Sequence, residues 1–345
     1  MEIGDAGLIG ILPSFGLHAS AFRIDRIGTG HIHQTFKLKG PKSFILQRVN
    51  KDVFKNPEII ASNLRTAGNY LTSHSPEYIF LKSVISETRQ EMVYDAQGFP
   101  WRLFPYIENT FSIDKVDTLE EAFGAATEFG RLTRYLDGVN VGLFRETIPN
   151  FHDLALRYNQ FGEALAASTS DRKEEAKDCI DAGRKTATLV DQYNQLIKSG
   201  SLRLRITHND TKINNILFDT TTRKAVCVID LDTLMPGYFI YDLGDMIRTF
   251  VCPVSEEEKD LSAVVVRREM YEAVVKGYLS QMREVMSPKE VAAIPFAGKM
   301  MTCIMALRFL ADYLCGDTYY HTTYPGQNLV RARNQFRLLE KLQEL

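Results

Sequence analysis

Apolar and polar residues alternate through most of the first hundred positions of the chain. Residues 22–38 alternate, are interrupted at Gly28 and Gly30, and alternate again, which predicts a two-stranded hairpin with a flexible tip. Pro57 precedes apolar positions at helical spacing and predicts a helix over residues 58–71. Further strands are expected over residues 44–49, 79–85, 90–95 and 100–107. The amino-terminal part is therefore predicted to be β-rich with one helix.

From about residue 117 the spacing of the apolar residues becomes helical. The pattern predicts helices over residues 118–137, 256–286, 288–315 and 328–344, and an amphipathic stretch over 152–200. A non-helical island at 202–231 interrupts them, with two short apolar strands around a turn. We expect an α+β fold with a small β-rich lobe over residues 1–106 and a larger, mainly helical lobe over residues 107–345.

Composition narrows the class of protein. The chain has 345 residues, 45% of them hydrophobic and 24% charged, which excludes a disordered chain and exceeds the usual size of a single core. Its 41 basic and 43 acidic residues give a net charge of −2, so nucleic acid is not an expected partner. The five cysteines form no CxxC pair. We expect a cytoplasmic protein with no membrane segment, and no obligate protein partner is evident.

The chemistry-bearing residues gather at the two ends of the island's predicted hairpin. Asp210 and Asn215 precede its first strand, and Asp230 and Asp232 follow its second. Carboxylates brought together repel one another unless a divalent cation joins them, and oxygen ligands of this kind suit Mg²⁺. The five-residue spacing from Asp210 to Asn215 is that of a kinase catalytic loop, in which the aspartate meets the acceptor hydroxyl and the asparagine binds metal.

These motifs resemble those of the aminoglycoside phosphotransferase and choline kinase superfamily. The common loop of that superfamily is H-G-D, and Asn209 stands in place of the glycine here. The longer stretches HNDTKINNILFD, IDLDTLMPG, YDLGD and RFLADYLCGDTYY resemble N-acetylhexosamine 1-kinases, as do GTGHIHQTF and FILQRVN near the amino terminus. The likeness covers most of the chain.

The resemblance implies a two-lobed, protein-kinase-like fold that transfers the γ-phosphate of ATP to a sugar, at the anomeric hydroxyl of an N-acetylhexosamine. Asp210 matches the catalytic aspartate, and Asn215 and Asp230 match the two magnesium ligands. His208 matches a histidine that braces the loop, and Asp242 matches an aspartate that buttresses it from a helix start. Catalysis in this class rests mainly on positioning and charge neutralisation.

The phosphate-binding side has weaker signals. Gly28, Thr29 and Gly30 form a GxG that by itself is most often a simple turn, and His33 occupies the place of a third glycine. Beside the catalytic island this GxG becomes the expected nucleotide loop, whose backbone N–H groups approach phosphates. No P-loop motif occurs. His31, at the hairpin tip, is a candidate contact for substrate hydroxyls.

The third strand departs from the kinase pattern because it carries no lysine to reach the nucleotide phosphates. Gln47 or Arg48 stands there instead, on opposite faces of the strand, and the alternation does not select between them. Arg48 is the candidate cation because a guanidinium binds phosphate. Tyr106, in the connector after the last strand, either lies beside the adenine or packs the junction between lobes.

The acceptor pocket is expected on the helical lobe. Arg308 lies in the block that resembles hexosamine kinases, in which an arginine contacts the sugar, and Tyr319 is a similar candidate. Arg308 and Asp312 are four residues apart and could equally form a structural ion pair. Two alternatives stand beside the sugar kinase: a kinase of the same fold for an aminoglycoside, choline or amino alcohol, and a non-catalytic nucleotide-binding module.

Overall fold

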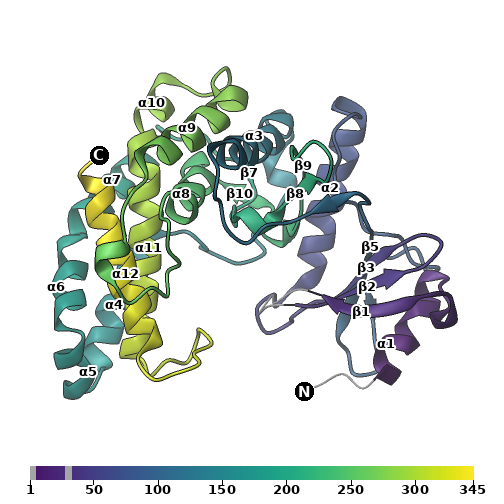
Figure 1. The fold of residues 1–345 in the computed structure, drawn as a ribbon, viewed down its shortest axis with the longest axis horizontal. Helices are drawn as coiled ribbons and strands as arrows, with labels where there is room; N and C mark the ends of the chain where they lie inside the picture. The colour runs from purple at the N-terminus through teal and green to yellow at the C-terminus, as the bar shows by residue number, and fades with distance from the viewer. Residues whose placement is uncertain (1–4, 28–32) are drawn as a thin grey trace. The chain divides into compact units, whose positions relative to one another are not determined.

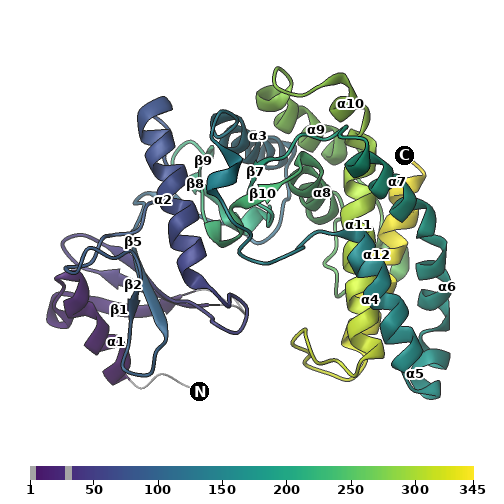
Figure 2. The same ribbon diagram turned by 180° about the vertical axis from the view of Figure 1, so that it is seen from behind.

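The computed structural model describes residues 5–27 and 33–345, and it divides the chain into two compact units, each assembled from separate stretches of sequence. The first unit comprises Met1–Phe111, Gly138–Pro149 and Leu217–Pro236. The second comprises Ser112–Asp137, Asn150–Ile216 and Gly237–Leu345. The elements of both are labelled in two ribbon views (Figures 1 and 2).

A five-stranded antiparallel sheet forms the centre of the first unit, with strand order β1-β2-β3-β5-β4. The alternating sequence predicted most of it, because apolar side chains gather on one face of the sheet and most of the polar ones lie on the other. The strands are β1 (Arg23–Ile27), β2 (Gln34–Lys39), β3 (Phe44–Arg48), β4 (Val93–Tyr94) and β5 (Pro100–Pro105).

The register of β3 and β5 gives this sheet two different faces. Leu46 pairs with Leu103 and the next pair is Gln47 with Arg102, so the apolar pair and the polar pair point to opposite sides. Helix α1 (Asp5–Ile11) and the 3-10 turn η1 (Leu12–Phe15) cover the apolar side (Figure 1). The core there consists of Leu8, Ile11, Leu12, Phe15, Leu38, Leu46, Trp101 and Leu103.

The rest of the first unit consists of one long helix and a second, smaller sheet, which leads into residues 230–236. Helix α2 (Pro57–His74) begins with proline, as predicted, and buries one apolar stripe. A three-stranded sheet joins β6 (Thr110–Phe111), β8 (Ile216–Asp219) and β9 (Ala225–Val228). The Asp219 carboxylate closes the turn between β8 and β9 by accepting the backbone N–H groups of Thr221 and Thr222. The 3-10 turn η5 (Leu231–Thr233) follows β9.

The second unit is mainly helical. A short strand, β7 (Arg205–Thr207), and the 3-10 turn η4 (Ile213–Asn215) lie on either side of the predicted catalytic loop, and β10 (Met235–Gly237) crosses the boundary between the units. The helices are α3 (Leu119–Tyr135), α4 (Leu154–Ala167), α5 (Ser170–Glu175), α6 (Lys177–Lys185), α7 (Ala187–Lys198), α8 (Phe239–Phe250), α9 (Arg268–Met282), α10 (Pro288–Ala292), α11 (Ile294–Leu314) and α12 (Gln327–Gln343).

Helix α11 is the core helix of the second unit and packs against α4, α8 and α12 (Figure 2). Within residues 5–27 and 33–345 it is the one helix that is long and apolar enough to cross a membrane. Of its most apolar window, 72% is buried inside the protein. Burial against neighbouring helices therefore accounts for its apolar composition.

Three predicted elements are wrong in type or extent. Residues 79–85 form no regular strand; Phe80 and Lys82 lie against Gly68 of α2 instead. The helix predicted from residue 256 begins at Arg268, because acidic side chains of the preceding loop pair with arginines of α8 and α12. Residues 288–315 form two helices because Pro295, which lacks an N–H donor, starts a new helix.

Two further differences concern helices. The stretch 152–200, for which the pattern indicated only amphipathic character, folds as four helices, α4 to α7. The sequence prediction did not include α8, whose residues are nearly all buried. Its polar residues Asp242, Asp245 and Arg248 recur every three residues and share one side of the helix, but they are buried as well.

Candidate active site

The catalytic loop predicted at residues 208–215 begins where strand β7 ends, in the second unit. Asn209 adopts a left-handed backbone conformation with φ of 65°. Glycine reaches this region without steric penalty and asparagine is among the few other residues that tolerate it. This conformation explains why the superfamily's common glycine can be replaced by asparagine without disturbing the loop.

Asp242, in the first turn of α8, anchors the loop through its backbone. Its carboxylate accepts the N–H groups of His208 at 3.0 Å and Asn209 at 2.7 Å, and its carbonyl accepts the Thr211 hydroxyl at 2.7 Å. Asp242 is fully buried, and burial raises its pKa to about 6 although His208 and the two N–H groups act in the opposite direction. Asp242 thus occupies the buttressing position that the resemblance implied.

The Asp210 carboxylate lies beside the Lys212 ammonium group, which no sequence signal identified. Lys212 Nζ lies 3.0 Å from Asp210 Oδ1, and the Asp210 side chain is 24% exposed. Burial alone would raise the pKa of Asp210, but Lys212 and His208 outweigh it and keep the pKa below its usual value. Asn215 donates from Nδ2 to the Asp210 carbonyl at 2.8 Å and to Oδ2 at 3.3 Å. Asp210 is therefore ionised at neutral pH and close to Asn215.

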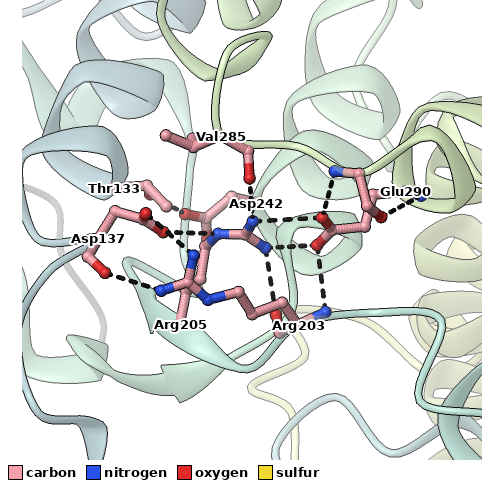
Figure 3. Close-up of polar contacts among 8 residues, drawn as sticks. Thr133, Asp137, Arg203, Arg205, Asp242, Val285 and Glu290 are labelled. Carbon is pink, nitrogen blue, oxygen red and sulfur yellow. Dashed lines mark hydrogen bonds and ion pairs between the residues drawn. The ribbon is translucent and has the colours of Figure 1, made fainter.

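A buried arginine fixes strand β7 just before this loop. Arg205 is 2% exposed and binds both carboxylate oxygens of Glu290 (Figure 3). Its Nε lies 3.0 Å from Asp137 Oδ1, and its Nη2 donates to the Val285 carbonyl at 2.8 Å. A guanidinium with this many partners has little rotational freedom. Arg205 therefore sets the direction in which the chain enters the catalytic loop.

His152 is a loop contact that no sequence signal identified, because it lies 57 positions before its partner. Its ring Nε2 hydrogen-bonds to the Asn209 carbonyl at 2.7 Å. The carbonyl accepts, so Nε2 carries the proton. Burial lowers the pKa of His152 to about 4, and within the described part of the chain its Nδ1 has no hydrogen-bond partner. His152 is thus a neutral imidazole fixed in one tautomer against the loop.

Arg308 and Asp312, on α11, do not form the ion pair that their spacing allowed. Asp312 accepts the backbone N–H groups of residues 318–320 and the side-chain amide of Asn328. Arg308 instead lies 5.4–5.7 Å from the ring centres of Phe151, Tyr319 and Tyr320, at cation–π range. Among the residues that the structure describes, Arg308 contacts no carboxylate.

The Tyr319 ring is 67% exposed and its hydroxyl lies 3.5 Å from Arg308 Nη2. The structure therefore brings these two predicted acceptor contacts together, on the second unit. Beside Arg308 the rings of Tyr319 and Tyr320 meet edge to face, with their centres 4.9 Å apart and an interplanar angle of 78°.

Asp230 and Asp232 lie in the first unit, directly after β9. Asp230 is exposed and left-handed, with φ of 57°, and Asp232 is buried. One ligand-type atom from each of His33, Asp230 and Asp232 lies within 4.8 Å of the others. Both oxygens of Asp232 are engaged, Oδ2 with His33 and Oδ1 with Arg102. Asp230 is therefore the more exposed of the two aspartates.

Gln47 and Arg48 lie on opposite faces of the sheet and have different neighbours. Arg48 lies on the face that α1 covers, with its guanidinium 3.4 Å from the ring centre of Phe99. Gln47 lies on the opposite face and accepts a hydrogen bond from Arg102 Nε at 3.0 Å. The structure thus brings Gln47, and not Arg48, to the side of the sheet where Asp232 is bound.

Other predicted nucleotide contacts are placed as follows. Tyr106 follows β5, and Lys37 Nζ lies 3.2 Å above its ring. Gly28, Thr29, Gly30 and His31 lie outside the described residues. His33 is described: its Nδ1 accepts the backbone N–H of Asn50 at 3.1 Å.

The donor atoms present fit a hard divalent cation in each unit taken separately. Asn215 uses Nδ2 toward Asp210, which leaves the amide oxygen Oδ1 as the donor that a cation prefers. Asp230 presents an exposed carboxylate. Oxygen donors of this kind suit Mg²⁺ or Ca²⁺ rather than a soft metal.

Solved structures with the same architecture are kinases of small molecules. A microcompartment-associated aminopropanol kinase matches with a TM-score of 0.64 at 16% identity, covering 99% of this chain and 98% of that one. The amicoumacin kinase hAmiN, in complex with AMP-PNP, Ca²⁺ and Ami, matches with a TM-score of 0.63 at 14% identity, covering 94% of this chain and 91% of that one. A choline/ethanolamine kinase family protein from Mesorhizobium loti has a TM-score of 0.61 at 16% identity, covering 99% and 95%.

These likenesses establish the fold, which is α+β and protein-kinase-like. Residues 23–286 match the model of the phosphotransferase enzyme family (APH), and the chain belongs to that family.

Proposed function

We propose that this protein transfers the γ-phosphate of ATP to the anomeric hydroxyl of an N-acetylhexosamine. The observation that carries the proposal is the ionised Asp210 beside Lys212 and Asn215, on a loop that Asp242 fixes through its backbone. A carboxylate held in this way can accept the proton of an acceptor hydroxyl as the phosphoryl group moves to it. The family supplies the reaction class, and the motif likeness to hexosamine kinases supplies the acceptor.

In the proposed mechanism Asp210 orients the acceptor hydroxyl and takes its proton. Asn215 Oδ1 and the Asp230 carboxylate would hold Mg²⁺, which when bound neutralises charge on the transferred phosphate. Lys212 adds a fixed positive charge beside Asp210. Because the transition state is loose, the contribution of these residues is mainly positioning and charge.

The proposed nucleotide-binding part is residues 1–106, with Gly28, Thr29 and Gly30 near the phosphates and Tyr106 near the adenine. Residues 107–345 would supply the catalytic loop and the acceptor site. We place the protein in the cytoplasm, where ATP is available; the five cysteines are free thiols, as a reducing compartment requires.

The acceptor site is proposed around Arg308. Choline, amino alcohols and aminoglycosides are cations, and a site for them needs carboxylates or an aromatic cage without a competing cation. Arg308 lies among three aromatic rings but is itself the cation there, and Arg157 lies close enough for the two guanidinium groups to repel. A neutral sugar whose acetamido carbonyl accepts from Arg308 and whose ring packs on Tyr319 suits this surface.

The test is an acceptor panel with ATP and Mg²⁺, read as ADP formation. N-acetylglucosamine and N-acetylgalactosamine are compared with glucosamine, choline, aminopropanol and an aminoglycoside. The proposal expects turnover with the N-acetylhexosamines, and a phosphorus–C1 coupling by NMR together with loss of the reducing end. Turnover only with a cationic acceptor would replace the sugar assignment. Nucleotide binding without turnover on any acceptor would favour a non-catalytic module.

A further inference from the structure

The missing third-strand lysine has a counterpart on the neighbouring strand. Gln47 of β3 is directly paired with Arg102 of β5, and both side chains lie on the sheet face opposite α1. Arg102 Nε donates to Gln47 Oε1 at 3.0 Å, and Arg102 Nη1 donates to Asp232 Oδ1. A cation is therefore present on this face, displaced by one strand from its expected position.

Asp232 connects Arg102 to the two segments expected to meet the nucleotide. The second oxygen of Asp232 binds His33, which directly follows residues 28–32, and Asp232 lies two positions after Asp230. Asn63 of α2 donates to the Leu234 carbonyl at 3.0 Å, which fixes the same segment from the other end. All of these residues belong to the first unit.

The burial of Arg102 decides how it can act. Its side chain is 2% exposed, and Nε and Nη1 are both used within the protein. A lysine that binds phosphate must instead reach the nucleotide directly. A buried ion pair also contributes little net stability compared with an apolar pair of the same size, so stability alone gives a weak reason for it.

We propose that Arg102 is a positioning residue that takes the place of the third-strand lysine: through Asp232 it orients the segment carrying Asp230 and so sets the affinity for the metal–nucleotide complex. The inference rests on the proposed function only in taking the substrate to be a metal-bound nucleotide. It assigns no contact between Arg102 and phosphate.

The test is a double-mutant cycle read as binding of AMP-PNP with Mg²⁺ by calorimetry, without any acceptor. Arg102→Met should weaken binding about tenfold or more in the wild-type background. In the Asp232→Asn background the same substitution should change the dissociation constant by less than about twofold, because the ion pair between Arg102 and Asp232 is already absent there. Equal losses in both backgrounds, or no loss in either, would overturn the proposal.

Folding is monitored by thermal melting of each variant. The Arg102→Met variant could unfold because Asp232 is left unpaired. In that case the positioning role is tested with the double variant Gln47→Arg, Arg102→Gln, in which the two side chains are exchanged. It returns a guanidinium to the same face, so affinity should recover to within about threefold of wild type. A folded swap variant that binds no better than Arg102→Gln alone would contradict the positioning role.

The control is a partly buried arginine–carboxylate pair of the second unit that lies outside the catalytic loop. Arg172→Met with Asp317→Asn removes this pair and should leave nucleotide affinity unchanged. A wild-type protein that fails to bind AMP-PNP with Mg²⁺ would contradict the proposed function itself. Normal binding by wild type and by the Arg102 variants alike would contradict only the role of Arg102.

Discussion

Residues 205–215 of the second unit and residues 230–236 of the first unit are built with the same devices. Each contains a non-glycine residue in the left-handed region, Asn209 in one and Asp230 in the other. Each is fixed by a buried arginine, Arg205 or Arg102, paired with a carboxylate. The two segments also carry the predicted catalytic and metal-binding residues. They differ in which atoms of the segment the supporting residues contact.

In residues 205–215 other elements hold the backbone of His208 and Asn209, whereas Arg205, in the strand before the loop, is held through its own side chain. Asp242 accepts two loop N–H groups, His152 binds a loop carbonyl, and the carboxylate partners of Arg205 come from other elements. In residues 230–236 the support depends on a side chain of the segment itself, because Arg102 and His33 both bind Asp232.

Because of this difference, we expect that a substitution in residues 205–215 can abolish catalysis without destabilising the protein, whereas a substitution in residues 230–236 would affect both. The side chain of Asp210 is not among the contacts that anchor its loop to α8, so its replacement should remove chemistry and little else. Replacing Asp232 would disturb both the fold of its segment and the orientation of Asp230. The following predictions test this contrast, from the largest expected effect to the smallest.

Asp210→Asn should lower turnover by about 10²–10⁴-fold, since the amide cannot accept the hydroxyl proton. The free energy of unfolding should fall by about 1 kcal/mol or less, because the lost pair with Lys212 is half exposed. ADP release and calorimetric AMP-PNP binding are measured on one preparation. Asp260→Asn, at an exposed 3-10 turn, is the control. Wild-type turnover in the Asp210 variant would remove it from the mechanism.

Arg205→Met should lower the free energy of unfolding by about 3–5 kcal/mol, because Glu290 is left as a buried, unpaired charge. Adding Glu290→Gln should restore part of that loss. Urea denaturation measures both variants, while nucleotide affinity is followed in parallel. A large loss of nucleotide affinity in the folded double variant would contradict the view that this arginine supports only the backbone.

Asp242→Asn should change how stability depends on pH. The pKa of Asp242 is raised from 3.8 to about 6 in the folded protein, so its stabilising contribution is complete below pH 3.8 and is lost as pH rises through 6. That shift corresponds to about 3 kcal/mol. The destabilisation caused by the substitution should therefore be larger at pH 4 than at pH 7. Urea denaturation of both proteins at the two pH values measures it, and equal losses would contradict the raised pKa.

Arg308→Met tests a position outside both segments and should have the smallest effect. If the guanidinium binds the acceptor, the Michaelis constant for the sugar should rise about tenfold, while that for ATP and the melting temperature stay unchanged. Arg333→Met, an arginine of α12 paired with Asp178 at the surface, is the control. A lower melting temperature with both Michaelis constants unchanged would show a structural role instead.

Local sequence patterns were enough to predict most of the fold. Alternation located the sheet strands, and apolar positions at helical spacing located α2, α3, α11 and α12. Both signals arise from residues that are neighbours in the chain, so they need no knowledge of distant contacts. The predictions missed α8, in which even the polar residues are buried, and they were wrong for residues 79–85, where Phe80 and Lys82 lie against α2 and no regular strand forms.

Motif spacing likewise placed Asp210 and Asn215 in contact, because they lie five residues apart on one loop. It also indicated the superfamily, which the family match confirms. The substitution of Asn209 for glycine was visible in the sequence, but its reason, a left-handed backbone, was not.

The sequence by itself therefore indicated the family, located the loop proposed to be catalytic and showed that the third strand carries no lysine. Only the tertiary structure decided that Gln47 lies on the same side of the sheet as Asp232 and that Arg102 is the cation on that side. It also decided that Asp312 binds backbone N–H groups and forms no ion pair with Arg308. Arg102 and Asp232 are 130 positions apart. Contacts over such separations depend on strand register and helix packing, which one-dimensional periodicity does not specify.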